Sequence, residues 1–305
     1  MTFVIQTSLE LGFMYALVSM ALFLSYRILD IADLTTDGCF VLGAAVSVTA
    51  AAAGHPVAAL FLAMAAGACA GFVTALLQTR LGVPSILAGI VTNTGLYTIN
   101  LMAMGWSSNK SLLGKSTIFT MLKDTGVFGD WYELVLAAAV TVTAGVLLYL
   151  FLGTRLGLSI RATGDNRDMV RASSVNTNFT ITLGLCIANA LTALSGAMVG
   201  QYQKTVDINS GTGIVVIGLA CLIIGETVLG RRSVLKGIVA VMVGSVIYRF
   251  IYAAVFYTKV VPVDFLKLIT ALVVAAAIAA PTVKKHLAFR RQKAAGRRKE
   301  AAEDA

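Results

Sequence analysis

The sequence has few of the residues that carry catalytic or metal chemistry. Histidine occurs only as His55 and His286. The four cysteines lie in apolar runs without a C-x-x-C spacing, at Cys39, Cys69, Cys186 and Cys221. Such a pattern argues against a histidine-based metal or acid–base centre, and it indicates that the cysteines are small core residues.

Charge is scarce as well. Only 13% of the 305 residues are charged, whereas 58% are hydrophobic and the mean hydropathy is +0.84. Because a bilayer-crossing helix needs roughly 20 mostly apolar residues, the chain has room for about eight or nine crossings. The longest stretches between apolar runs are too short for a soluble catalytic or ATP-binding domain. We therefore expect any energy source to be a partner protein or an ion gradient.

Apolar runs and the sparse prolines at their edges divide the chain into nine candidate spans. They cover residues 7–26, 38–53, 57–79, 84–104, 132–153, 178–202, 213–229, 237–257 and 263–280. The second and seventh are short for a full crossing, which is typical of broken or re-entrant helices. The sequence thus predicts an all-α polytopic membrane protein with 8–10 transmembrane helices, one or two of them broken or re-entrant. A transmembrane domain over residues 1–281 would precede a tail over 282–305.

Lysine and arginine predict the orientation. The tail carries eight basic and three acidic residues, and basic loops are retained in the cytoplasm. The C-terminus is therefore expected inside, together with Arg27 and the loops 154–177 and 230–236. We interpret the tail as a contact for anionic lipid headgroups and not as a nucleic-acid arm. The absence of basic residues before Arg27 argues against a cleaved signal peptide.

The most informative polar segment is the loop 157–172. Gly164 is expected to end a helix, and Asp165 or Asn166 to cap a new one of about two turns. This helix would present Met169, Val170, Ala172, Arg167 and Arg171. By physics alone it is either an interfacial helix on lipid headgroups or a docking helix for a cytosolic partner.

Polar residues within apolar spans form two stripes. The fourth run carries Asn93, Tyr97 and Asn100 on one helical face, and the sixth carries Asn189, Thr192 and Gly196. Either stripe could line a solute path, because intramembrane polar groups tend to face cavities. The alternative is interhelical hydrogen bonding, worth about 0.6 kcal/mol per bond.

Glu226, near the cytoplasmic end of the seventh run, is the best ionisable candidate inside the membrane. We expect it to reach the interface or to pair with Arg231 or Arg232. A proton-coupling role is the alternative.

Several of these segments together resemble a known family. They are the run RATGDNRDMVRASSVN from Arg161, the string DLTTDG from Asp33, and Ile223-Ile-Gly225-Glu226. The chain is similar to the membrane subunits of ABC importers in the branched-chain amino acid and ribose permease family. Glu226, where the wider family has glycine, and the DLTTDG string resemble a less characterised branch linked to tryptophan- or tyrosine-type amino acids.

The resemblance implies a transport subunit and not an enzyme. In that family the segment at 161–172 forms a coupling helix that docks in a groove of the ATPase. Carried over, Arg161, Gly164, Asp165 and Asn166 would shape the helix start, and Arg167, Asp168 and Arg171 would face the ATPase. The chain itself would bind no cofactor, because ATP and Mg²⁺ belong to the partner ATPase dimer. A second permease copy, in a homodimer, and an extracytoplasmic solute-binding protein complete the expected assembly in a bacterial inner membrane.

The leading hypothesis is therefore the translocation subunit of an ABC importer for a small solute such as an amino acid. The alternative is a secondary transporter driven by an H⁺ or Na⁺ gradient. That class often shows inverted repeats and intramembrane ionisable residues. We find no convincing repeat, and Glu226 is the only good ionisable candidate.

Overall fold

The computed structural model describes residues 2–124, 126, 129–230 and 233–257, with the single positions 272, 275 and 279. It divides into a unit over Met1–Ala253 and a unit over Ala254–Ala305. The first unit contains nearly all of the described residues and is the one considered below. The predicted ninth span and the basic tail lie outside the described residues, apart from those three positions.

The described elements follow the apolar runs in order. They are α1 (Thr2–Leu22), η1 (Phe23–Ile28, a π-helix), α2 (Thr36–Ala52), α3 (Pro56–Thr79), α4 (Ser85–Ala103), β1 (Asn109–Ser111), α5 (Ile118–Asp124), η2 (Gly129–Trp131, a 3₁₀-helix), α6 (Tyr132–Gly153), α7 (Arg155–Asp165), α8 (Arg167–Ala172), α9 (Thr177–Gln203), β2 (Thr205–Asp207), α10 (Ile214–Leu229) and α11 (Val234–Tyr257).

Six helical segments are long and apolar enough to cross a bilayer. They are Val4–Ile28, Pro56–Thr79, Ser85–Ala103, Gly129–Gly153, Thr177–Gln203 and Val234–Val255. Two shorter apolar helices, α2 and α10, coincide with the second and seventh predicted runs. The prediction of an all-α polytopic membrane protein is confirmed, and the two runs that are short in the sequence are short helices in the structure.

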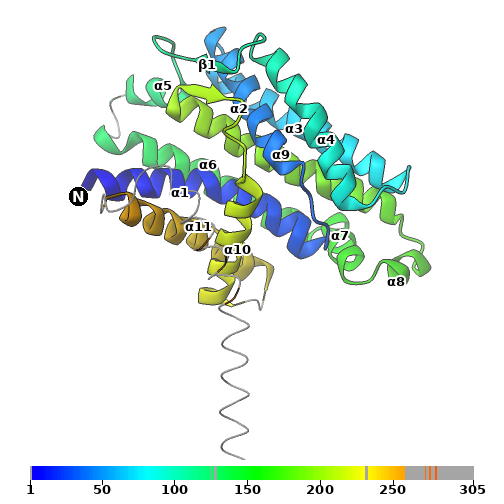
Figure 1. The fold of residues 1–305 in the computed structure, drawn as a ribbon. Helices are drawn as coiled ribbons and strands as arrows, with labels where there is room; N and C mark the ends of the chain where they lie inside the picture. The colour runs from blue at the N-terminus through cyan, green and yellow to red at the C-terminus, as the bar shows by residue number, and fades with distance from the viewer. Residues whose placement is uncertain are drawn as a thin grey trace, which may run out of the picture. The chain divides into compact units, whose positions relative to one another are not determined.

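Helix α9 lies at the centre and packs against both α2 and α3 (Figure 1). Glycines allow this close approach. A Cβ atom on Gly43 would collide with the Ala193 carbonyl oxygen, and one on Gly196 would collide with the Phe40 carbonyl oxygen. On α3, Gly67 fits against the α9 backbone in the same way. The small residues at these positions therefore form the packing surface between α9 and its neighbours.

Helix α1 is fastened to its neighbours by hydroxyl groups that donate to its backbone carbonyl oxygens. Ser195 of α9 donates to Met14 at 2.7 Å, and Thr141 of α6 donates to Phe13 at 2.8 Å. Ser245 of α11 donates to the Gly12 carbonyl at 2.7 Å. Each of these hydroxyls is buried, so the bonds satisfy polar groups that lipid could not satisfy.

The loops that follow α4 and α9 are joined by a short ladder. β1 and β2 pair antiparallel, with Asn109 opposite Asp207 and Ser111 opposite Thr205. Three-residue strands carry no usable periodicity, so the sequence does not predict them. The pairing therefore holds the loop after α4 beside the loop after α9.

Candidate functional site

The first candidate element is the helix pair α7–α8. The sequence predicts that Gly164 ends a helix, but this is wrong, because α7 continues through Gly164 to Asp165. A Cβ atom on Gly164 would collide with the carbonyl oxygen of Ile28 and would crowd Leu29. Glycine is therefore needed here for close packing of α7 against η1, and not for a turn.

Asn166 is the point at which the chain changes from α7 to α8. Its extended backbone conformation, with φ −155°, separates the two helices. Its side-chain Oδ1 accepts from the backbone N–H groups of Asp168 at 3.1 Å and Met169 at 3.0 Å. Of the two residues expected to cap the new helix, Asn166 is the one that does so.

The surface of α8 is more polar than the sequence analysis predicts. Val170 was expected to be presented, but it is only 3% exposed and belongs to the core. Arg171 is exposed, and its Nε donates to the Thr177 hydroxyl at 3.1 Å, which ties α8 to the start of α9. Arg167 and Asp168 are exposed beside Met169, which is 55% exposed. The outward face of α8 thus combines both charge signs with one flexible apolar side chain.

Arg161 and Asp165 line a cavity of about 530 Å³ between α7 and η1, here called the α7 cavity. Arg27 and Ile28 of η1 line it from the other side. Every residue of the predicted docking segment therefore lies on α7, on α8 or at their junction. The docking role of these residues stays a prediction.

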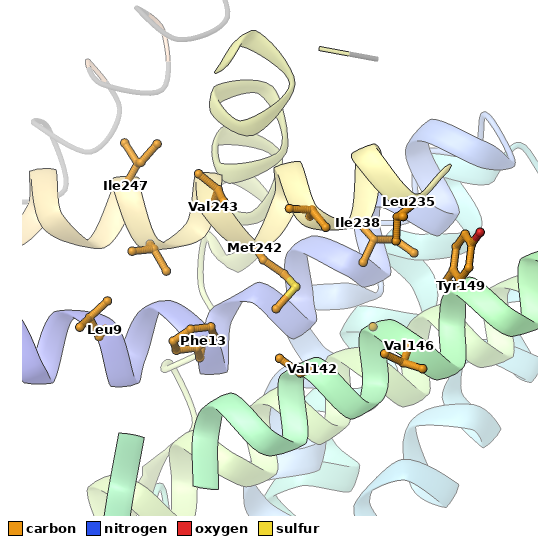
Figure 2. Close-up of a pocket in the computed structure, with 13 residues that line it drawn as sticks. Leu9, Phe13, Val142, Val146, Tyr149, Leu235, Ile238, Met242, Val243 and Ile247 are labelled. Atoms are coloured by element: carbon orange, nitrogen blue, oxygen red, sulfur yellow. The ribbon is translucent and has the colours of Figure 1, made fainter. Parts of the chain in front are cut away.

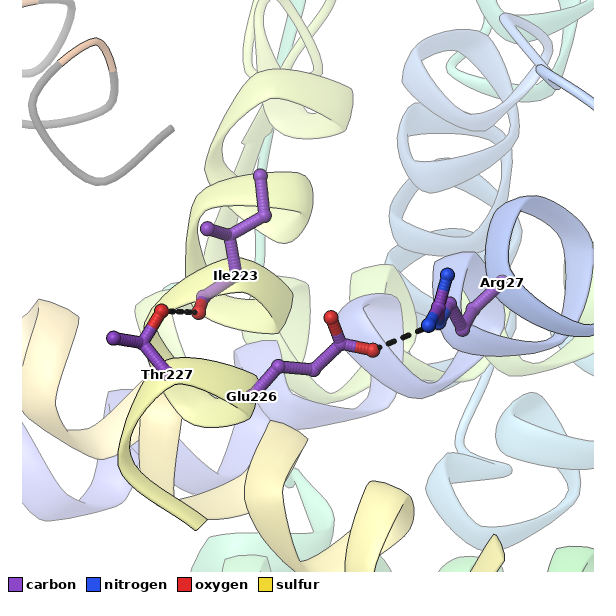
Figure 3. Close-up of polar contacts among 4 residues, drawn as sticks. All are labelled: Arg27, Ile223, Glu226 and Thr227. Atoms are coloured by element: carbon purple, nitrogen blue, oxygen red, sulfur yellow. Dashed lines mark hydrogen bonds and ion pairs between the residues drawn. The ribbon is translucent and has the colours of Figure 1, made fainter. Parts of the chain in front are cut away.

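Glu226 has a different partner from the one predicted. Its Oε1 lies 3.0 Å from Nε of Arg27, as Figure 3 shows. The predicted partners, Arg231 and Arg232, lie outside the described residues. The Glu226 side chain is 4% exposed and that of Arg27 is 41% exposed, so the ion pair extends from the protein interior to its surface. It connects η1, on which Gly164 packs, to α10.

The second candidate element is a polar cavity of about 350 Å³ between α2, α4 and the loop before α10. The whole stripe of Asn93, Tyr97 and Asn100 lines it, with Thr94 from the same helix. The remaining lining residues are Asp37, Gly38, Val41, Ile208, Asn209, Gly211 and Thr212. The structure therefore brings the α4 stripe together around one space, and the role of that space stays a prediction.

Asp37 is the carboxylate that lines this cavity, and the sequence reasoning did not select it as a site residue. Its carboxylate accepts from the backbone N–H groups of Gly213 at 3.1 Å and Val215 at 2.9 Å, which begin α10. An acidic residue in the first turn of a helix such as α2 is an ordinary feature, so only the fold reveals that it also caps a second helix.

The α9 stripe is placed elsewhere. Asn189 is 1% exposed and donates through Nδ2 to the carboxylate of Asp33 at 2.7 Å and to the Leu185 carbonyl at 3.1 Å. Thr192 is equally buried and donates to the Ala188 carbonyl at 3.1 Å. Neither residue lines the polar cavity of α2 and α4, and their contacts are hydrogen bonds within the helix bundle.

A third space differs in chemistry. Figure 2 shows a groove of about 480 Å³ between α1, α6 and α11. It is lined by Leu9, Phe13, Val142, Gly145, Val146, Tyr149, Leu235, Ile238, Val239, Met242, Val243, Val246 and Ile247. Its apolar walls suit hydrocarbon and offer almost nothing to a polar solute.

Among the described residues, no group of three or more His, Cys, Asp or Glu side chains could hold a metal ion.

Comparison with known proteins agrees with this picture of a polytopic transport subunit. Residues 4–278 match the family described as branched-chain amino acid transport system / permease component. The tyrosine transport system permease protein of Clostridioides difficile (strain R20291) is 35% identical over 265 residues, which cover 87% of this chain and 86% of that protein. An uncharacterized protein of Rickettsia prowazekii (strain Madrid E) is 32% identical over 88% of this chain and 95% of its own length.

More distant relatives include the autoinducer 2 import system permease protein LsrC of Escherichia coli O9:H4 (strain HS). It is 27% identical over 57% of this chain and 49% of its own length. No solved structure matches the chain. The family match spans nearly the whole chain and agrees with the multi-pass helical fold. The chain therefore belongs to the branched-chain amino acid transport permease family and is a membrane transport subunit of the ABC importer class, not an enzyme.

Proposed function

We propose that this permease forms the translocation path of an ATP-driven importer, with α7–α8 as the docking element for a separate ATPase dimer. The observation that carries the proposal is a continuous series of contacts from α7 to the cavity of about 350 Å³ between α2 and α4. Gly164 packs on the backbone of Ile28, and the adjacent Arg27 pairs with Glu226 of α10. The opposite end of α10 is capped by Asp37 at the cavity.

Helix α10 is suited to carry movement between these two points. From its first residue to Glu226 it spans about 18 Å at 1.5 Å per residue. A helix of this length moves as a rigid element, and it is held at one end by an ion pair and at the other by two charge-assisted hydrogen bonds. Displacement of α7 by the ATPase would therefore reach the cavity through packed backbone and paired charges, which are the physical requirement for coupling.

The docking surface itself favours a protein partner of mixed charge. Arg161, Arg167 and Arg171 alternate with Asp165 and Asp168, and all five are exposed. Complementary charges on the ATPase would fix the register of docking more than its affinity. ATP and Mg²⁺ would bind to that partner, and the permease would supply no bond chemistry.

The solute is proposed to be a small polar organic molecule such as an amino acid. The polar cavity supports this choice, since it combines a carboxylate, three amides and a phenol in about 350 Å³. The similarity to the tyrosine transport system permease protein of Clostridioides difficile also supports an amino acid as the solute. A second copy of the chain would complete the path, and an extracytoplasmic binding protein would deliver the solute. The assembly would lie in a bacterial inner membrane with the C-terminus in the cytoplasm.

The proposal is tested by replacing Gly164–Arg171 with a glycine–serine linker of equal length. The permease is co-expressed with a candidate ABC ATPase from the same organism and is purified through a tag on the permease. We expect the ATPase to co-purify with the wild type and to be lost from the linker variant. A matched pair of point variants refines the test: Arg167→Glu should weaken ATPase retention. Arg80→Glu, a charge reversal at an exposed position after α3, should not.

Energy coupling separates the two transport classes. Uptake by the wild type should stop when ATP is depleted and should persist when an uncoupler collapses the ion gradient. A secondary transporter would behave in the opposite way. Uptake that survives ATP depletion, or an ATPase that stays bound to the linker variant, would contradict the proposal.

A further inference from the structure

The polar cavity between α2 and α4 has an unbalanced charge. Among the described residues that line it, Asp37 carries the only carboxylate, and none is a lysine, arginine or histidine. A buried or half-buried charge without a counter-charge is costly unless hydrogen bonds or a ligand compensate for it. The charge of this cavity therefore restricts the solutes that it can accept.

The carboxylate of Asp37 is fixed in place. One oxygen accepts from the Gly213 N–H at 3.1 Å and the other from the Val215 N–H at 2.9 Å. Burial disfavours the charged form of the carboxylate, whereas these two bonds and the start of the helix favour it. Each carboxylate oxygen can accept more than one hydrogen bond, and acceptor capacity therefore remains for a ligand.

Asn100 adds a second acceptor to the same cavity. Its Nδ2 donates to the Gly38 carbonyl at 3.0 Å, and this bond determines which side-chain atom is the oxygen. The side chain is 2% exposed, and its Oδ1 has no hydrogen-bond partner among the described residues. A buried amide oxygen without a partner favours a donor that arrives from outside.

From these two observations we infer that the cavity recognises a protonated primary amine, with Asp37 as the counter-charge and Asn100 as a second acceptor. The inference rests on the proposed role of this cavity in the solute path. An ammonium group has three donors and no acceptor, which is the complement of a carboxylate beside an amide oxygen. Tyr97, which is 52% exposed, adds an aromatic face that attracts cations. A solute with only a carboxylate would be repelled.

The inference is tested by protection of a cysteine placed in the cavity. Thr94 is exposed and lines the cavity, so Thr94→Cys in a chain whose four native cysteines are replaced by alanine gives a single reporter thiol. The permease in membrane vesicles is treated with N-ethylmaleimide in the presence of phenethylamine or 2-phenylethanol. The two probes share the same carbon skeleton and differ in the charged group.

We expect phenethylamine to slow the labelling of the reporter thiol, and 2-phenylethanol to protect it about tenfold less well at equal concentration, since a charge-assisted hydrogen bond has about that effect. Asp37→Asn should remove the difference between the probes. Asn93→Asp, which adds a carboxylate to the same wall, should increase it, and Asn93→Lys should abolish it. If Asp37→Asn fails to fold, the Asn93 variants alone test the inference, because Asn93 does not cap a helix as Asp37 does.

Equal protection by the two probes, or a preference for phenethylamine that survives Asn93→Lys, would overturn the inference. Labelling requires neither ATP nor an ATPase, whereas the proposed function is tested by ATPase retention and ATP dependence. A permease that retains its ATPase but does not prefer the amine would therefore refute this inference alone. A wild-type permease that retains no ATPase but is still protected by the amine would refute the proposed function alone.

Discussion

The guanidinium of Arg27 and the carboxylate of Glu226 join η1 to α10 across a distance of 3.0 Å between Nε and Oε1. The two residues lie far apart in the sequence. Because η1 also carries the backbone on which Gly164 rests, the ion pair lies between the proposed docking element and the helix that begins at the polar cavity.

Reversal of this pair should show whether the two helices depend on each other. Arg27→Glu alone and Glu226→Arg alone each place like charges together, so each should lower the melting temperature of the purified permease by a few degrees. This shift corresponds to about 1 kcal/mol for a partly exposed pair. The double variant should recover most of the loss. Differential scanning fluorimetry in detergent measures the effect, and a double variant no more stable than the single ones would contradict a direct interaction.

The sequence predicts the apolar helices well because the length and hydropathy of a segment's own residues decide whether it can cross a bilayer. All eight apolar runs before residue 258 correspond to helices. The interactions that position them depend on residues distant in the chain. Glu226 was therefore assigned to the nearest arginines in sequence, whereas the fold pairs it with Arg27.

The candidate site is predictable only in part, for the same reason. Helical periodicity places Asn93, Tyr97 and Asn100 on one face, and the structure gathers them at one cavity. Periodicity cannot find Asp37, which contributes from another helix. The prediction for Gly164 is wrong because it considers the helix alone. Glycine destabilises isolated helices, but packing against η1 keeps Gly164 within α7.

Gly164→Ala should separate α7 from η1. The added methyl group would meet the Ile28 carbonyl, and backbone atoms cannot move aside as a flexible side chain can. We expect a loss of about 1–3 kcal/mol in stability, together with weaker ATPase retention. Gly153→Ala is the matched control, because a Cβ atom there has no neighbour within 4 Å. Retention of the ATPase at the wild-type level by Gly164→Ala would show that this contact does not position α7.

Asn166→Ala should weaken docking without affecting the membrane fold. The cap of α8 is lost, which costs about 1 kcal/mol, or roughly a fivefold loss in affinity if α8 must be folded to bind. Asn166→Asp should restore the cap. Surface plasmon resonance of the immobilised permease against the ATPase measures the affinity.

Asn176 provides the control for this variant. It caps α9 through the same two-bond geometry, with Oδ1 accepting from Asn178 at 3.0 Å and Phe179 at 3.2 Å. Because α9 is long and packed on several neighbours, Asn176→Ala should leave ATPase affinity nearly unchanged. An equal loss of affinity in both variants would mean that capping of α8 has no specific role.

Gly196→Ala should destabilise the centre of the bundle, because the new methyl group would overlap the Phe40 carbonyl on α2 and force α2 and α9 apart. The expected cost is about 1–3 kcal/mol, visible as a lower melting temperature. Gly145→Ala is the matched control. It is also a buried glycine in a helix, but its nearest neighbour would be the end of the flexible Met20 side chain at 3.3 Å. Alanine favours a helix by about 1 kcal/mol over glycine, so the control should be neutral or more stable. If both variants lost the same stability, backbone contact between α2 and α9 would not be what requires glycine at position 196.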